Sequence, residues 1–191
     1  MTKTVDIARA SYMEMQSRTL YILRGLPASG KTTWAKAQSK AHGSWLKRVN
    51  MDDLRSMLDD GVYSPEREYA VSRIKLMSIT QLLLLGYSVM SDDTNLQPHT
   101  CADLMKVATI TGAGVEVVHF EGSSRLCVER DSFRSKPVGE ETILRMSAQF
   151  TSIYLTAADP LRDVPTTVVV IGDLDGTYLR AGSAHSGTRI G

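Results

Sequence analysis

The sequence predicts an α/β protein with a mostly parallel central sheet flanked by helices on both faces. Short apolar segments alternate with longer helix-forming segments, and a glycine-rich turn at 25–30 follows the first apolar segment. Strands that alternate with helices need crossover connections, which give a parallel sheet covered on both sides. Because ligands of such sheets bind at the carboxyl ends of the strands, we expect functional residues directly after strands.

Apolar runs and helix start and stop signals locate the elements. The run 20–23 is short and apolar throughout, as a buried strand is. Ser64 and Pro65 supply a capping residue and a proline at the first helical position. Gly43 and Gly86 are helix stop signals. In chain order, the expected elements are strand 20–23, helix 34–40, strand 45–50, helix 65–85, strand 87–90, helix 98–108, strand 115–120, helices 123–133 and 140–154, and strand 166–171.

The composition is that of an ordinary globular protein. The 191 residues include 22 Lys and Arg against 21 Asp and Glu, for a net charge of +1, and 42% are hydrophobic. These values exclude a disordered chain, a collagen and a coiled coil. The near-zero charge argues against a protein that coats nucleic acid through bulk electrostatics. Aromatic residues make up only 6% of the chain, so no stacking platform for single strands is obvious.

The remaining global features indicate a cytoplasmic protein without a membrane partner. No apolar run approaches the ~20 residues needed to span a bilayer, and the N-terminus lacks the basic and apolar segments of a signal peptide. Cys101 and Cys127 are isolated, which gives neither a disulfide framework nor metal-ligand spacing. A reducing compartment is therefore expected.

Residues 25–32, Gly-Leu-Pro-Ala-Ser-Gly-Lys-Thr, match the phosphate-loop pattern G-x-x-x-x-G-K-[ST] between an expected strand and an expected helix. Such a turn directs successive N–H groups toward a phosphate, and the helix adds its positive end. Lys31 is expected to reach the β- and γ-phosphates, and the Thr32 hydroxyl to bind Mg²⁺. The context favours nucleotide binding over a turn that is glycine-rich by chance. The residues expected to bind ATP are Gly25, Pro27, Ala28, Ser29, Gly30, Lys31, Thr32, Thr33, Arg130 and Arg134.

Charged residues follow the second and third strands. A carboxylate at Asp52 can take the proton from an attacking hydroxyl, and Arg55 shares its face if the segment is helical. The alternative is a helix start with acidic capping residues and an exposed arginine. Residues 91–95 contain acids that can orient Arg55 or a metal-bound water, or form a polar loop with a helix cap.

Arg130 and Arg134 are four residues apart on an expected helix and so face the same way. They can close over the nucleotide phosphates as a lid, where planar guanidinium groups spread transition-state charge. Glu129 and Asp131 are interleaved with them, so a solvated helix face is the alternative.

Four stretches, residues 25–34, 49–55, 91–98 and 130–134, resemble in order and spacing the kinase domain of bacteriophage polynucleotide 5′-kinase/3′-phosphatases. The resemblance covers roughly residues 19–178. It implies a P-loop kinase fold and transfer of the γ-phosphate of ATP, or of another nucleoside triphosphate, to the 5′-hydroxyl of DNA or RNA.

The resemblance also implies roles for individual residues. Asp52 is the general base, and Arg55 grips the phosphate next to the acceptor nucleoside. Asp93 holds that arginine, and Thr94 helps with the acceptor phosphate. Arg134 binds the donor phosphates, and Lys31 and Thr32 keep the roles given above. One departure lies in the phosphate loop, where Ala28 replaces a glycine; the replacement is tolerable if Ala28 keeps a negative φ.

A second motif follows the last expected strand. Asp173 and Asp175 resemble the nucleophile motif of haloacid-dehalogenase-type phosphatases, in which the first acid attacks a phosphate and the second protonates the leaving group. The chain ends too soon to supply the rest of that domain, so no phosphatase activity is expected. The expected organisation is an extension at 1–18, a kinase domain at 19–160, and a truncated phosphatase segment with a disordered tail, including residues 181–187, at 161–191.

Two rival functions stay open on the sequence. One is a kinase that phosphorylates a small molecule such as a nucleoside, antibiotic or sugar, which has no need of a phosphate-binding group at Arg55. The other is a non-catalytic nucleotide-binding module, which has no need of Asp52. Tyr63, Tyr69 and Met77 are expected to be packing residues rather than a base-stacking site.

Overall fold

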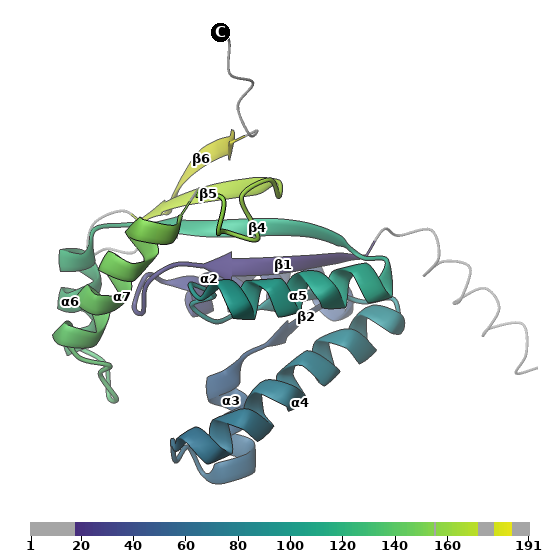
Figure 1. Cartoon of the computed structure of the whole chain (residues 1–191), viewed down its shortest axis with the longest axis horizontal. Helices are drawn as coiled ribbons and strands as arrows, with labels where there is room; N and C mark the ends of the chain where they lie inside the picture. Colours follow the sequence, from purple (N-terminus) through teal and green to yellow (C-terminus); the bar gives the residue numbers. More distant parts are fainter. Residues whose placement is uncertain (1–17, 155, 172–177, 185–191) are drawn as a thin grey trace, which may run out of the picture.

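The computed structural model describes residues 18–154, 156–171 and 178–184, whose strands form one six-stranded sheet in the order β2-β3-β1-β4-β5-β6 (Figure 1). The strands are β1 (Thr19–Arg24), β2 (Leu46–Val49), β3 (Ser88–Ser91), β4 (Gly114–Glu121), β5 (Thr166–Ile171) and β6 (Tyr178–Ala184). The helices are α2 (Lys31–His42), α3 (Met51–Asp59), α4 (Pro65–Leu84), α5 (Pro98–Thr111), α6 (Ser124–Ser132) and α7 (Glu140–Ile153), and the 3-10 turn η1 (Gly43–Trp45) follows α2.

The sheet confirms the predicted α/β class. Strands β1 to β5 pair in parallel, and β6 is antiparallel to β5. One apolar cluster joins the sheet to α4 and α5 through residues such as Ile79 and Leu104, and a second joins it to α2 through Ala35. Alternate residues of β1, such as Ile22 and Leu23, enter the two clusters because successive strand side chains point to opposite faces. Helices therefore cover both faces, as predicted.

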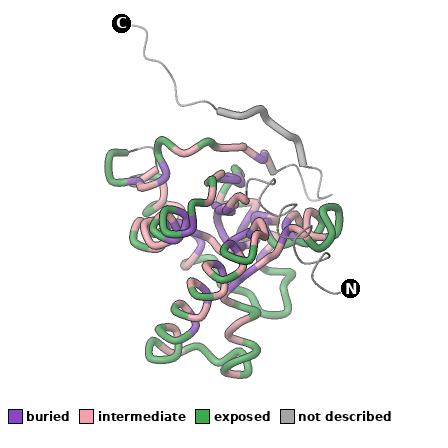
Figure 2. The backbone as a smooth tube through the Cα atoms, turned by 90° about the vertical axis from the view of Figure 1, so that its right-hand side faces the viewer, coloured by how far each residue is buried: buried purple, intermediate pink, exposed green. Residues whose placement is uncertain are grey.

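Buried residues concentrate on the sheet and on the inner sides of the helices, whereas the turn between α3 and α4 is exposed (Figure 2). The prediction that Tyr63, Tyr69 and Met77 are packing residues is wrong, since they are 69%, 73% and 58% exposed. All three belong to the α3–α4 hairpin, whose outer surface faces solvent. In the part of the chain that the structure describes, none of the helices combines the length and the apolar character needed to cross a bilayer.

Helix α3 was not among the elements expected from the sequence. It begins after Asn50, whose side-chain oxygen accepts a hydrogen bond from the Asp53 N–H at 2.7 Å. This cap satisfies one of the N–H groups that a helix start leaves unpaired. Asp52 and Arg55 therefore lie on a helix, the condition under which they were expected to share a face.

The C-terminal part of the described chain extends the same sheet. β5 pairs with β4 in parallel, so residues 166–171 continue the main sheet across the boundary expected at 160. Residues 181–184, expected to be disordered, belong to β6. β6 pairs antiparallel with β5, which satisfies the edge of β5 that would otherwise be open. Asp173 and Asp175 lie outside the described residues.

A buried ion pair ties β1 to the segment before β5. Arg24 donates to Asp159 at 2.7 Å, with side chains 2% and 0% exposed. The Arg24 guanidinium also lies over the rings of Phe150 and Tyr154, at 4.8 and 5.4 Å from their centroids. His119 of β4 stacks on Tyr154 with ring centroids 4.9 Å apart. The end of α7 is thus attached to the carboxyl ends of β1 and β4.

Candidate active site

The sheet order brings three loops together. β2, β3 and β1 are neighbours, so the segments that follow their carboxyl ends lie side by side. These segments hold the phosphate loop, Asp52 and residues 91–95, as expected for ligand-binding residues of a parallel sheet. Arg130 lies in the last turn of α6, and Arg134 lies two residues beyond the end of that helix. Neither follows β4 directly, and the expectation that one helix carries both arginines is wrong.

The backbone geometry of the phosphate loop explains why two of its positions are glycines. A Cβ on Gly25 would lie 2.9 Å from the carbonyl oxygen of Phe120, closer than real Cβ atoms approach. The Gly25 N–H donates to the Thr94 carbonyl at 3.1 Å, which ties the loop to the segment after β3. Gly30 has φ 88° and caps α2, which begins at Lys31 rather than at the expected 34. Both positions favour glycine.

Ala28 does not keep the negative φ under which its replacement of a glycine was expected to be tolerable. Its φ is 59°, in the left-handed region. For a residue with a Cβ, this conformation costs about 1–2 kcal/mol. The loop therefore holds Ala28 in a strained conformation beside the nucleotide pocket, which is where backbone strain is often found.

Lys31 is folded onto the loop that it belongs to. Its Nζ donates to the carbonyl oxygens of Gly25 and Leu26 at 2.9 and 2.6 Å and to Ser29 Oγ at 3.1 Å. The residue is 7% exposed, and burial lowers its pKa from 10.5 to about 8, with Asp92 acting in the opposite sense. These three oxygens accept the hydrogen bonds that Lys31 Nζ would otherwise donate to a phosphate.

Asp92 lies beside the phosphate loop and was not among the individual residues singled out from the sequence. Its Oδ1 accepts from the Thr32 hydroxyl at 3.3 Å, and its Oδ2 accepts from Arg48 Nε at 2.6 Å. Burial raises the pKa of Asp92, and the hydrogen bond from Arg48 opposes this rise. A hydroxyl and a buried carboxylate are hard oxygen ligands of the kind that Mg²⁺ prefers, so this pair fits the expected metal.

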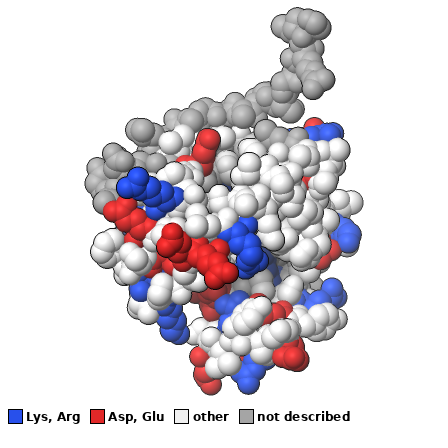
Figure 3. Space-filling model, turned by 60° about the vertical axis from the view of Figure 1, so that its left-hand side comes forward, with Lys and Arg blue, Asp and Glu red and all other residues white. Residues whose placement is uncertain are grey.

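Arg130 and Arg134 line one open cavity of about 250 Å³ together with Ala28, Gly30, Lys31, Thr32 and Thr33. Figure 3 shows that this side of the molecule is hollowed and that basic side chains lie at the edges of the hollow. Buried Asp131 organises the loop between α6 and α7, because its Oδ2 accepts from the N–H groups of Val138 and Gly139 at 2.8 and 2.9 Å. Arg134 donates to the same carboxylate at 3.2 Å. Both lid arginines thus lie across from the phosphate loop.

On the acceptor side, Arg55 lies between two carboxylates. Its Nε and NH2 donate to the two oxygens of Glu68 at 2.5 and 3.0 Å, and its NH1 donates to Asp52 at 2.6 Å. The Asp52 side chain is 73% exposed, so it is open to a substrate. Among the described residues these bonds use three of the five N–H groups of Arg55, and two are left for a phosphate oxygen.

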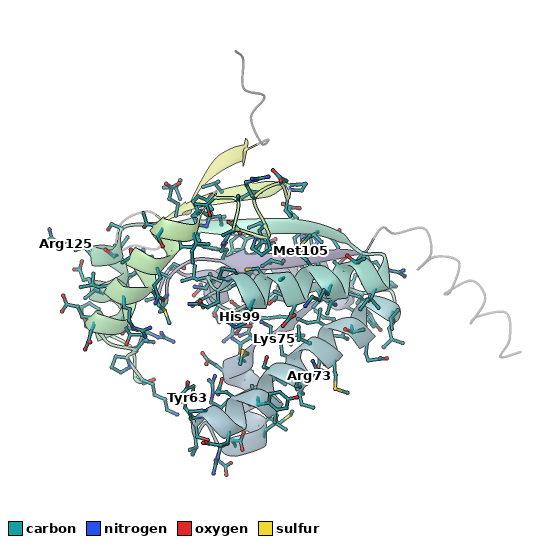
Figure 4. The ribbon with its side chains drawn as sticks, in the orientation of Figure 1. Tyr63, Arg73, Lys75, His99, Met105 and Arg125 are labelled. Atoms are coloured by element: carbon teal, nitrogen blue, oxygen red, sulfur yellow. The ribbon has the colours of Figure 1, made fainter. Side chains whose placement is uncertain are left out.

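The resemblance implied that Asp93 holds Arg55, and this prediction is wrong. Asp93 pairs with buried Lys75 of α4 at 2.6 Å and accepts from the Met51 N–H at 2.9 Å. Figure 4 shows Lys75 between α4 and the sheet. Glu68 of α4 takes the expected role of Asp93, and Asp93 fixes the start of α3 instead. Glu68 lies in the acidic first turn of a predicted helix, but no spacing signal connects it to Arg55.

The two halves of the site are joined by a chain of hydrogen bonds. Arg48 at the end of β2 donates to Asp92 and, through NH1, to Asp53 at 2.5 Å. Asp92 in turn accepts from Thr32, so the sequence of contacts runs from the phosphate loop to the first turn of α3. Asp52 is the neighbour of Asp53 in that turn. The residues expected on the donor and acceptor sides therefore belong to one connected network.

A family model described as an AAA domain matches residues 20–153, more than half of the chain. The chain is a member of this AAA domain family. The matched range of the AAA domain includes the phosphate loop, α3, the start of α4 and the loop between α6 and α7, so the whole candidate site lies within it.

The AAA domain is similar to several known proteins. A curated relative, the L-seryl-tRNA(Sec) kinase of Methanococcus maripaludis, is 26% identical over 150 residues, which cover 76% of this chain and 57% of the relative. A chain in a solved Pnkp1/Rnl/Hen1 RNA repair complex is 27% identical with a TM-score of 0.63, covering 72% of this chain and 45% of that one. A gluconokinase from Sinorhizobium meliloti, 19% identical with a TM-score of 0.54 over 81% and 83% of the two chains, shares the fold. The AAA domain thus has a P-loop kinase-like fold and spans less than two thirds of the first two proteins.

Proposed function

We propose that this AAA domain is an ATP-dependent polynucleotide kinase that transfers the γ-phosphate to the 5′-hydroxyl end of DNA or RNA. The observation that carries the proposal is the Arg55 guanidinium, which Glu68 holds beside the exposed carboxylate of Asp52. A polynucleotide end presents a hydroxyl next to a phosphate, which a base and a cation side by side can bind together. A small alcohol without an anionic group makes no use of that cation.

On the donor side, the phosphate loop binds the triphosphate. Lys31 exchanges its contacts with loop oxygens for the β- and γ-phosphates, and Arg130 and Arg134 spread the charge that develops on the transferred group. Thr32 and Asp92 would hold Mg²⁺, which would supply further positive charge at the phosphates.

On the acceptor side, Asp52 takes the proton of the 5′-hydroxyl as the hydroxyl oxygen forms its bond to the γ-phosphorus. The bond from that phosphorus to the oxygen bridging to the β-phosphate breaks, and ADP leaves. Arg55 binds the phosphate on the 3′ side of the acceptor nucleoside and so aligns the hydroxyl. Transfer of this kind depends mainly on positioning and charge stabilisation.

Two of the three similar proteins reported above support a kinase that acts on nucleic acid. One belongs to an RNA repair complex, and another is named as a kinase of a seryl-tRNA. The seryl-tRNA kinase favours one second candidate, a kinase whose acceptor hydroxyl is carried by the seryl group of a tRNA. The two candidates differ in the hydroxyl that faces Asp52.

The acceptor can be identified with γ-labelled ATP, Mg²⁺ and a panel of hydroxyl compounds: a 5′-hydroxyl oligonucleotide, a nucleoside 3′-monophosphate, the bare nucleoside, gluconate and seryl-tRNA. We expect label on the oligonucleotide and on the 3′-monophosphate. Use of the bare nucleoside should be weaker by about 10- to 100-fold, since a hydrogen bond to a charged group contributes about 1.5–3 kcal/mol. Equal use of the nucleoside and its 3′-monophosphate, or label on seryl-tRNA alone, would contradict the proposal.

A further inference from the structure

Tyr63 is an exposed aromatic residue at the edge of the acceptor site. It lies in the turn between α3 and α4, and its residue is 69% exposed. The Arg55 guanidinium lies over its ring, 5.8 Å from the ring centroid. Figure 4 shows Tyr63 at the end of α4 that faces the loop between α6 and α7. An aromatic ring therefore lies open to solvent beside the cation of the acceptor site.

The position of the ring is linked to the catalytic groups through Arg55. Glu68 binds Arg55 through two hydrogen bonds, and Asp52 binds it through a third. Because the guanidinium is fixed from two sides, a ring in contact with it has a defined place relative to Asp52. A planar group stacked on Tyr63 would consequently lie next to the hydroxyl-binding carboxylate and the phosphate-binding arginine.

The loop between α6 and α7 supplies a second cation near this turn. A Cβ on Gly61, two residues before Tyr63, would lie 3.6 Å from Lys136 Nζ. Lys136 belongs to the loop between α6 and α7 that Asp131 organises. Two cations, Arg55 and Lys136, therefore lie near the turn that carries Tyr63. An exposed ring with cations nearby is the combination that binds single-stranded nucleic acid, because bases stack on the ring and phosphates bind the cations.

From this arrangement we infer that Tyr63 is the platform on which the terminal base of a polynucleotide acceptor stacks, with the adjoining phosphate on Arg55 and the next phosphate toward Lys136. The inference rests on the proposed function and adds a subsite for the acceptor base. Stacking tolerates any base, because every base has a flat π face. Tyr63 is then a specificity-determining residue that favours polynucleotide ends over alcohols without a base.

The test compares Tyr63→Ala with Tyr69→Ala, a matched exposed tyrosine on α4, on two acceptors. One acceptor is a 5′-hydroxyl oligonucleotide, and the other is the same oligonucleotide with an abasic 5′-terminal residue. Tyr63→Ala should raise the KM for the normal oligonucleotide about 5- to 150-fold, the range expected for one lost base stack. Tyr63→Phe should rescue it, and Tyr69→Ala should leave it at the wild-type value.

The abasic acceptor makes the test independent of how the variant folds. Wild-type protein should use the abasic oligonucleotide as poorly as Tyr63→Ala uses the normal one, and the variant should show no further loss on the abasic acceptor. If wild-type protein phosphorylates normal and abasic ends equally well, the Tyr63 subsite is overturned and the proposed function stands. If wild-type protein transfers phosphate to no polynucleotide, the proposed function and the subsite both fail.

Discussion

The environment of Lys31 in the phosphate loop changes the pKa of its ammonium group. Its ammonium group is buried among two carbonyl oxygens and the Ser29 hydroxyl, none of which carries a charge. Burial therefore lowers its pKa to about 8. A bound triphosphate would replace these oxygens with charged ones and raise the pKa again.

This linkage predicts that the protein takes up a proton when it binds ATP near pH 8.5. At that pH, much of the Lys31 population is neutral before binding and protonated after it. At pH 6.5, Lys31 is already charged in both states, so the uptake through this group disappears. Isothermal titration calorimetry in buffers of different ionisation enthalpy measures the uptake. Lys31→Arg, which stays charged at both pH values, is the control, and an uptake at pH 8.5 that survives in this variant would contradict the assignment.

Individual partners were the part of the site that the sequence predicted least well. The phosphate loop could be predicted because its eight residues are contiguous and its chemistry depends on local backbone geometry. Glu68 could not be assigned to Arg55, since the pair forms only where α4 packs against α3. The same packing sends Lys75 to Asp93 and so removes Asp93 from the role that the resemblance implied. Spacing along the chain carries no information on such partners.

At the scale of elements, the junction of β1, β4 and α7 combines a buried ion pair with stacked aromatic rings. His119 is 7% exposed and stacks against Tyr154 and Phe150. Burial lowers the pKa of His119 to about 4, and the nearby positive charge of Arg24 acts in the same sense. The imidazole is therefore neutral in the folded protein above that pH.

This burial predicts a loss of stability in acid. Between about pH 6.5 and pH 4 the unfolded chain binds a proton at His119 that the folded protein does not, so the free energy of unfolding falls as the pH falls. The full effect is about 3 kcal/mol. His119→Phe keeps a ring in the cluster and removes the titration. Urea unfolding from pH 7 to pH 4.5 should give a steeper loss for the wild-type protein than for the variant. Parallel stability curves would show that His119 does not cause the loss of stability in acid.

Elements were predicted where their signals are regular. The alternation of apolar runs and helix formers gave all five parallel strands and most of the helices. A helical turn was considered at Asp52 and Arg55, but the bounds of the nine-residue helix α3 were not predicted, because its start depends on the Asn50 cap. β6 was missed because its glycine and small residues are typical of loops, and its pairing with β5 decides its structure.

For the molecule as a whole, the proposed function requires that donor and acceptor bind in one cleft at the carboxyl ends of β1, β2 and β3. The order of these strands puts the phosphate loop and α3 on neighbouring segments, and the contacts from Thr32 through Asp92 and Arg48 to Asp53 connect them. In the proposed function, the Asp52 carboxylate on that first turn of α3 acts on a hydroxyl beside the γ-phosphate.

Single-turnover transfer from γ-labelled ATP to a 5′-hydroxyl oligonucleotide by Asp52→Asn tests this claim most directly. Asp60→Asn, the same change of charge at the exposed end of α3, is the control. We predict that Asp52→Asn slows transfer by about 10²–10⁴-fold, as expected for the loss of a general base, while its Kd for ATP stays that of the wild-type protein. Transfer by Asp52→Asn at the rate of Asp60→Asn would contradict the account.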